Sequence, residues 1–207
     1  IERAIVSQII RSSGVFFTSN FIPEKNRTFY GAKIIPNRGA WLEFETDANN
    51  VIWVKIDRKR KVAVTSLLRA FGLETDEEIL AKFQDVDTHP DIKFIETTLG
   101  KDVSNSQDEG LIEVYKRIRP GDLATADNAK SLIYAMFFNF SRYDFCKVCR
   151  YKLNQRFGTE YELNEEHRIL KLEDVISVVK EIIRLNITQD EADDIDHLGN
   201  RRIRAVG

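Results

Sequence analysis

The stretch "AWLEFETDANNVIWVKID" (residues 40–57) is the most informative about the architecture, because apolar and polar side chains alternate along both of its halves. A period of two is typical of a β-strand with one buried face. The halves are separated by Asp47-Ala48-Asn49-Asn50, residues that tolerate turn geometry. The stretch therefore predicts a β-hairpin. Counted outward from the turn, Trp41 lies opposite the neighbourhood of Ile56 and Asp57.

Shorter strand patterns precede this hairpin, and helical patterns follow it. Strands are predicted at "AIVSQII" (4–10), "GVFFTS" (14–19) and "FYGAKIIP" (29–36). The apolar period then becomes helical, which predicts helices at 65–72, 75–83, 109–118, 125–138, 142–157 and 171–186. Thr75 and Thr125 stand where N-caps are expected, and residues 86–108 are predicted to be an irregular loop. The fold class is α+β, with N-terminal antiparallel strands and a hairpin followed by a mainly helical region.

Composition excludes several classes of protein. The 207 residues carry 31 basic and 33 acidic side chains, so a nucleic-acid site must come from local clustering. No apolar run reaches the length of a membrane span, and we expect a soluble, intracellular protein. Cys146 and Cys149 are too few for a disulfide framework and are predicted to be reduced thiols. The three histidines show no metal-ligand spacing. The strand-like start at Ile1 suggests a piece of a longer chain.

The basic run Arg58-Lys59-Arg60-Lys61 follows the hairpin, at the end of the ribbon that also carries Trp41. Cations can hold phosphates, and an aromatic ring at the same edge offers a face to an unstacked base. Four charges at a strand end are also commonly no more than solvated. Both interpretations remain open on this feature alone.

The last residues, "DDIDHLGNRRIRAVG" (193–207), combine both charges and allow three interpretations. Carboxylates and an imidazole could hold a divalent cation; the residues are Asp193, Asp194, Asp196 and His197. The arginines that follow could instead pair with these carboxylates; they are Arg201, Arg202 and Arg204. An arginine beside an aspartate could also recognise a base edge.

Two further arginines stand alone at the ends of predicted elements. Arg119 precedes a Pro-Gly pair, and Arg142 starts a predicted helix. Each such residue is more often structural than functional. No nucleophile–base arrangement or Gly-rich phosphate loop is present, so the chain itself is predicted to be non-catalytic, with no catalytic residue and no metal or cofactor of its own.

Six stretches taken together resemble the beta subunit of bacterial DNA-directed RNA polymerase, and they occur in that subunit's order. They are "ERAIVSQIIRSSGVFF", "AKIIPNRGAWLEFETD", "VKIDRKRK", "YKRIRPGDLATADNAKSLIYAMFF", "RYDFCKVCRYKLNQRF" and "DDIDHLGNRRIRAVG". The part resembled is the lobe domain, here residues 13–194. Residues 1–12 and 195–207 correspond to flanks of the neighbouring protrusion, where the chain leaves and returns through one neck.

The resemblance implies a role in DNA-templated transcription, with the lobe lining the downstream DNA cleft and touching the single-stranded non-template strand. Positions matching contacts to that strand are Trp41, Asp57, Arg58, Lys59, Arg60, Arg119 and Arg142. Positions matching a pocket for one flipped guanine are Arg11, Ile195, Asp196 and Arg201. The resemblance also implies that Arg11 lies near the last three in space.

The resemblance implies a parent enzyme that is a nucleotidyltransferase, with its catalytic magnesium held by the beta-prime subunit. The implied partners are DNA (the non-template single strand and the downstream duplex), the beta-prime, alpha and omega subunits, and sigma and elongation factors, with no membrane. The implied location is the bacterial cytoplasm, at the nucleoid. In an alternative reading the lobe acts mainly as a docking surface for sigma or elongation factors.

Overall fold

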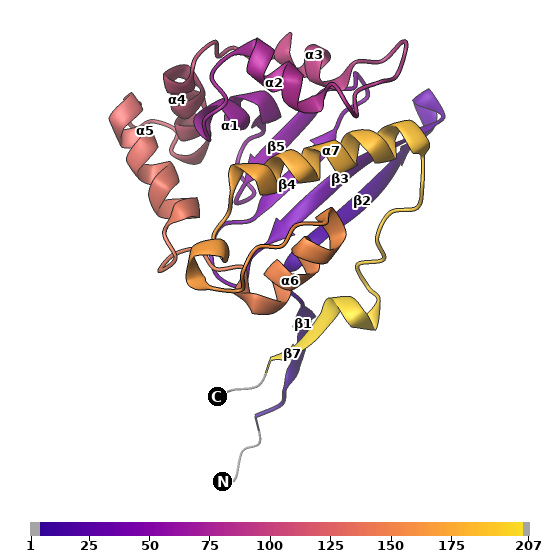
Figure 1. Cartoon of the computed structure of the whole chain (residues 1–207), viewed down its shortest axis with the longest axis vertical. Coiled ribbons are helices and arrows are strands. Elements are labelled where there is room, and N and C mark those ends of the chain that lie inside the picture. Colours follow the sequence, from indigo (N-terminus) through magenta and orange to yellow (C-terminus); the bar gives the residue numbers. More distant parts are fainter. Residues whose placement is uncertain (1–4, 205–207) are drawn as a thin grey trace.

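A computed structural model describes residues 5–204 and contains one antiparallel sheet of five strands in the order β2-β3-β4-β5-β6 (Figure 1). The α+β class predicted from the alternating and helical periods is confirmed. The strands are β2 (Gly14–Ile22), β3 (Arg27–Ile35), β4 (Leu42–Thr46), β5 (Ile52–Ile56) and β6 (Val62–Ala63).

The central hairpin has the register that the alternation predicted. Leu42 pairs with Ile56 across β4 and β5, and the backbone N–H of Asp57 donates to the carbonyl of Trp41 at 2.8 Å. Apolar side chains of both strands are buried on one face, whereas Glu43, Glu45 and Lys55 lie half-buried on the other. The sheet therefore has a covered face and an open face.

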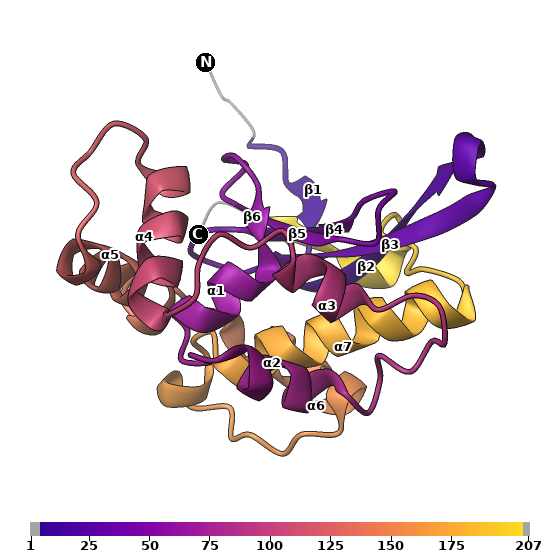
Figure 2. The ribbon, with the colours of Figure 1, turned by 90° about the horizontal axis from the view of Figure 1, so that it is seen from above.

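Most helices lie on the covered face of this sheet, where α7 packs against β3, whereas α4 and α5 stand beside the sheet (Figures 1 and 2). The two predicted N-caps are confirmed: Thr75 forms a capping box with Glu78, and the side chain of Thr125 accepts from the N–H of Asn128. The helices are α1 (Val64–Ala70), α2 (Asp76–Phe83), α3 (Phe94–Leu99), α4 (Gln107–Ile118), α5 (Ala126–Ile133), α6 (Cys146–Phe157) and α7 (Leu172–Thr188), with a π-helical turn, η2 (Tyr134–Phe138), after α5.

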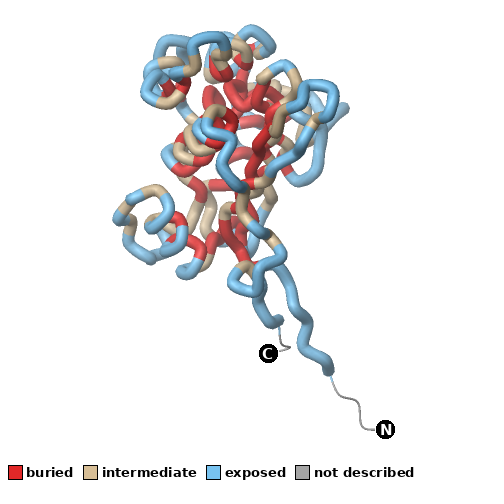
Figure 3. The backbone as a smooth tube through the Cα atoms, turned by 90° about the vertical axis from the view of Figure 1, so that its right-hand side faces the viewer, coloured by how far each residue is buried: buried red, intermediate tan, exposed pale blue. Residues whose placement is uncertain are grey.

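Loops rise from the opposite side. In Figure 2 the β5–β6 connection, the α4–α5 connection and the N-terminal strand all extend toward the open side of the sheet. Figure 3 shows the buried backbone concentrated in the body of the molecule, on one continuous core. Within residues 5–204, no helix has the length and apolar character that crossing a membrane requires.

A separate two-stranded ribbon extends from the body (Figures 1 and 3). It consists of β1 (Gln8–Arg11) and β7 (Arg201–Arg204), which pair antiparallel and are exposed along their whole length. Arg11 is the register partner of Arg201, and the N–H of Ser12 donates to the carbonyl of Asn200 at 2.9 Å. The predicted proximity of Arg11 and Arg201 is confirmed. The start of the predicted strand 4–10 at Ala4 lies outside the described residues.

Two predictions about secondary structure were wrong. Residues 86–108 are not wholly irregular, because they contain α3, whose Phe94 and Ile95 are buried against the core. Arg142 does not start a helix. The backbone of Asp144 instead pairs with Asn37 and Arg38 in the β3–β4 loop, and this bridge delays the start of α6 to Cys146.

Candidate nucleic-acid interface

The turn between β5 and β6 holds a cation over an aromatic ring. Asp57 and Arg58 both have positive φ, 50° and 60°, and the N–H of Lys59 donates to the carbonyl of Ile56 at 3.0 Å. This is the pattern of a tight hairpin turn. The guanidinium carbon of Arg58 lies 5.2 Å from the centre of the Trp41 ring, within cation–π range.

Arg58 is an unusual residue for this turn. Positive φ is routine for glycine and tolerated by aspartate, but it costs an arginine on the order of 1 kcal/mol. The hydrogen bonds from Asp57 to Trp41 and from Lys59 to Ile56 hold the turn in this conformation. The backbone of Arg58 is therefore held in an unfavourable conformation at the point where its side chain lies over the indole of Trp41.

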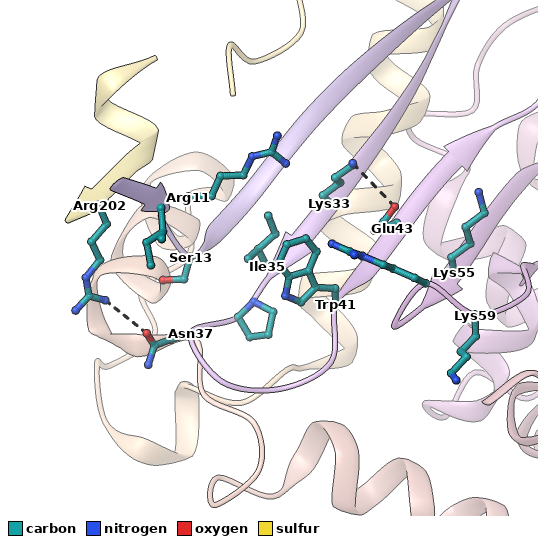
Figure 4. Close-up of a pocket in the computed structure, with 13 residues that line it drawn as sticks. Arg11, Ser13, Lys33, Ile35, Asn37, Trp41, Glu43, Lys55, Lys59 and Arg202 are labelled. Carbon is teal, nitrogen blue, oxygen red and sulfur yellow. Dashed lines mark hydrogen bonds and ion pairs between the residues drawn. The ribbon is translucent and has the colours of Figure 1, made fainter. Parts of the chain in front are cut away.

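The Trp41 ring faces a cavity of about 940 Å³ between the open face of the sheet and the ribbon (Figure 4). We name it the open-face cavity. Four of the residues predicted to contact DNA line it, from elements far apart in the sequence. They are Arg11, Trp41, Arg58 and Lys59.

The cations of this cavity divide into paired and unpaired groups. Lys33 lies 4.0 Å from the carboxylate of Glu43, and Lys55 lies 2.7 Å from that of Glu45. The remaining cations have no carboxylate partner among residues 5–204; they are Arg11, Arg58, Lys59 and Arg202. These four charges are available to an anionic ligand.

Sequence reasoning did not single out Lys33, Lys55 and Asn37, which also line the open-face cavity. The alternation with period two could have placed both lysines at the cavity. Lys33, Glu43 and Lys55 alternate with core residues along their strands, so their side chains share the outward face of the sheet. Asn37 comes from the β3–β4 loop, where no period applies.

The predicted guanine-pocket residues gather at the base of the ribbon. Arg201 donates through Nη2 to Oδ1 of Asp196 at 2.8 Å, and Ile195 precedes that aspartate in the same turn. Arg11 lies opposite Arg201 in register. Arg11 lines the open-face cavity, whereas Arg201 lines a neighbouring one.

The other predicted contacts lie outside the open-face cavity. Asp57 and Arg60 are exposed in the β5–β6 connection. Arg119 ends α4, which is tied to that connection because Arg117 donates through Nε to the carbonyl of Lys61 at 3.3 Å. Arg142 is exposed beside the β3–β4 loop. None of these four residues lines the open-face cavity.

The acidic residues of the terminal segment have different interaction partners. Asp193 pairs with Arg156 at 2.9 Å and accepts from the N–H of Phe17, so it does not meet the terminal arginines. The ion-pair interpretation of this segment is confirmed for Asp196 and Arg201. His197 accepts from the N–H of Gly199 in its own turn. Across residues 5–204, no group of three or more His, Cys, Asp or Glu side chains is placed to hold a metal ion.

The class of this protein follows from a comparison with protein families. The model of the family described as RNA polymerase Rpb2, domain 2, matches residues 11–204. The chain therefore belongs to this family, and the matched segment includes the sheet, the helices and β7, together with the last residue of β1, Arg11.

Individual relatives are named DNA-directed RNA polymerase subunit beta. The chain is 46% identical over its whole length to the protein of Dehalococcoides mccartyi (strain CBDB1), 43% identical to that of Chloroflexus aggregans, and 44% identical to that of Thermosynechococcus vestitus. It spans 16%, 19% and 18% of these proteins respectively, so it corresponds to less than a fifth of each relative.

Proposed function

We propose that the chain is the lobe segment of the beta subunit of a DNA-dependent RNA polymerase, where it lines the downstream DNA cleft and contacts the single-stranded non-template strand. The observation that carries this proposal is the open-face cavity, whose lining combines the Trp41 ring, with Arg58 over it, and unpaired cations from three separate segments. Membership of the Rpb2 domain 2 family supports the same role.

The chemistry of the cavity suits an unpaired strand. A base can stack on an exposed aromatic face, which contributes about 1–3 kcal/mol per base, and every base has such a face. Arg11, Arg58 and Lys59 can hold the phosphates on either side of the stacked base. Trp41 would then be the stacking platform, and the cations would fix the path of the backbone.

A second set of residues would read one base. Arginine and aspartate side by side can meet the donor and acceptor edge of a guanine. The 2.8 Å pair of Arg201 and Asp196, with Ile195 beside it and Arg11 opposite, supplies this combination at the ribbon base. We assign the flipped non-template guanine to this group.

The division into domains is part of the proposal. Residues 13–194 would be the lobe, and residues 1–12 and 195–207 the flanks that join it to the protrusion. Pairing of β1 with β7 outside the main sheet supports one neck. Of these flanks, residues 1–4 and 205–207 lie outside the described part of the chain.

The proposed assembly joins this segment to the other polymerase subunits and to DNA in the bacterial cytoplasm, at the nucleoid. Nucleotidyl transfer and the magnesium it needs would belong to the complete enzyme, with the metal held by beta-prime. This segment would position DNA and take no part in bond formation.

The test uses complete polymerase carrying Trp41→Ala and Arg201→Ala in the beta subunit, with the lifetime of the promoter open complex as readout. We expect a shorter lifetime, because the strand loses a stacking platform and a base contact. Trp53→Phe is the matched control, since Trp53 lies on the same face but donates to Asp47 at 2.9 Å and is covered by Lys61. An unchanged lifetime in the double variant would contradict the proposal.

The docking alternative predicts a different dependence on salt. Phosphate contacts release counterions, so binding of a single strand should weaken steeply as salt rises. Capture of sigma or an elongation factor that persists in high salt, together with single-strand binding that does not respond to salt, would favour the docking role.

A further inference from the structure

A second cavity of about 610 Å³ lies where the ribbon meets the start of α6, and we name it the ribbon cavity. Its lining includes five cations and no carboxylate residue. The cations are Lys147, Lys152, Arg168, Arg201 and Arg202, which come from α6, the segment before α7, and β7. A concave site of this composition raises the local concentration of anions.

Two of these cations already have carboxylate partners. Arg168 donates to both oxygens of Asp144, at 2.9 and 2.6 Å, and these bonds raise the pKa of its guanidinium. Arg201 is paired with Asp196. Neither residue is a free charge in the absence of a ligand.

The other three cations contact only neutral groups or none. Lys152 donates to the carbonyl of Gly199 at 3.2 Å, and Arg202 donates to Oδ1 of Asn37 at 3.5 Å. Lys147 is exposed and makes no hydrogen bond or ion pair with any residue between 5 and 204. A carbonyl or amide oxygen does not neutralise a cation, so three positive charges face one cavity uncompensated.

Neutral donors complete the lining. The hydroxyls of Ser12 and Ser13 lie at the cavity, and Oγ of Ser13 is 3.2 Å from Sγ of Cys146. The first turn of α6 contributes Cys146, Lys147 and Val148, and the N-terminus of a helix carries partial positive charge. Lysines, arginine and hydroxyls together match the several acceptor oxygens of a phosphate group.

The two cavities adjoin. Ser13 and Arg202 line both of them, and the register partners Arg11 and Arg201 face one cavity each. A strand that leaves the open-face cavity across the ribbon would therefore meet the cations of the ribbon cavity next.

We propose that the ribbon cavity binds a phosphate group through Lys147, Lys152 and Arg202. In the polymerase this phosphate would belong to the nucleic-acid strand that passes the open-face cavity, and this second statement rests on the proposed function. The cations and hydroxyls of the site recognise a phosphate oxyanion, and a free oligophosphate would fit them as well as a strand does.

Cys146 is a built-in reporter for the test. It is half-buried and lines the ribbon cavity, whereas Cys149 is fully buried and burial raises its pKa far above the ordinary value. Alkylation by iodoacetamide in the 207-residue chain therefore reports on Cys146. The probes are tripolyphosphate and an oligo-dT strand, each added before the reagent.

We expect both probes to slow the alkylation of Cys146 in the wild-type chain, and Lys147→Gln with Lys152→Gln to abolish the protection. In the same double variant the slope of log affinity for oligo-dT against log salt should become shallower by about 0.7, because the single phosphate contact of the ribbon cavity is lost. The control is Lys82→Gln with Lys101→Gln, which removes the same charge at α2 and after α3 and should keep the protection.

The outcomes separate the two sources of phosphate. Protection by tripolyphosphate alone supports a phosphate site but contradicts the statement that a nucleic-acid strand occupies it. The proposed function would not be contradicted by this result, because it is tested separately at Trp41. Protection by neither probe, or equal protection in the Lys147 and Lys152 variant, overturns the inference. Loss of protection in the control variant would overturn it as well, because the effect would then follow net charge.

Discussion

Arginines on the two sides of the sheet have opposite environments. On the covered side, Arg150 is fully buried and donates to both oxygens of Asp174 at 2.6 and 2.9 Å. On the open side, Arg58 is exposed, lies over Trp41, and has no carboxylate partner within residues 5–204. The same residue type therefore fixes the core in one place and offers free charge in the other.

The difference shows what separates a structural cation from a binding cation in this fold. Arg69 is also buried, and it contacts Asp76 and Asp102 in a polar network between α1 and the segment after α3. A buried charge needs a fixed partner, because desolvation is otherwise too costly. A cation that keeps its hydration can exchange water and salt ions for a ligand.

The largest expected effect is on the covered side. Arg150→Met should lower the free energy of unfolding by about 3–5 kcal/mol, because Asp174 is left buried without its partner. Urea denaturation of the 207-residue chain measures this value. Adding Asp174→Leu should recover much of the loss, since no unpaired charge then remains.

Arg58→Met is the matched change on the open side. It should alter the free energy of unfolding by no more than about 0.5 kcal/mol, as for most exposed positions. Comparable losses at Arg150 and Arg58 would remove the distinction between the two sides.

The next effect concerns the packing of the helices. A methyl group added at Gly110 of α4 would lie 2.8 Å from Cβ of Arg69 and 2.9 Å from the carbonyl oxygen of Ser66 in α1. Gly110→Ala should therefore cost about 1–3 kcal/mol in urea denaturation. Gly100→Ala is the control, because its nearest contact would be an ordinary 3.5 Å, and a cost equal to that at Gly110 would contradict the close approach of α1 and α4.

A pH-dependent effect is expected from Asp102. Burial acts to raise the pKa of its carboxyl, but hydrogen bonds from Ser104, Thr65 and Ser66 outweigh burial and lower it. A lowered pKa in the folded state stabilises the protein above the unfolded pKa of about 3.9, and this contribution is lost as pH falls through the folded value.

The measurement compares the urea midpoints of the wild-type chain and Asp102→Asn between about pH 7 and pH 3. The wild-type advantage should be full at neutral pH and shrink toward the acid end. A difference in urea midpoint that stays constant with pH would show that the charge of Asp102 contributes nothing to the stability of the folded state.

The smallest effect on stability is expected at Lys59. Lys59→Gln should leave the urea midpoint nearly unchanged and reduce the salt slope of single-strand binding by about 0.7. Lys61→Gln is the comparison, because Lys61 lies 3.7 Å from Glu45 and outside the open-face cavity. Equal salt slopes in the two variants would mean that a lysine lining the open-face cavity contributes no more to single-strand binding than a lysine outside it.

Much of the fold followed from the sequence, because local patterns carried it. The period of two fixed the hairpin and its open face, and Thr75 and Thr125 marked helix starts. The helix inside 86–108 and the late start of α6 depend on tertiary contacts. Phe94 packs into the core, and Asp144 pairs with a loop more than a hundred residues away in the chain.

The candidate site was predictable only in part. Trp41 and the basic turn could be placed at one hairpin end from the register alone. The nearness of Arg11 and Arg201 came from the family resemblance, since no local pattern joins positions so far apart. The burial of Arg150 was not anticipated, because its partner Asp174 lies on another helix.

The decisive experiment is a titration of the 207-residue chain carrying Trp53→Phe with oligo-dT at low salt, in which the fluorescence of Trp41 is followed. We predict that a base stacks on the indole and changes its emission, that high salt reverses the change, and that Arg58→Ala weakens it. An emission that does not respond while the strand is bound would contradict the claim that the open face receives unpaired DNA through Trp41.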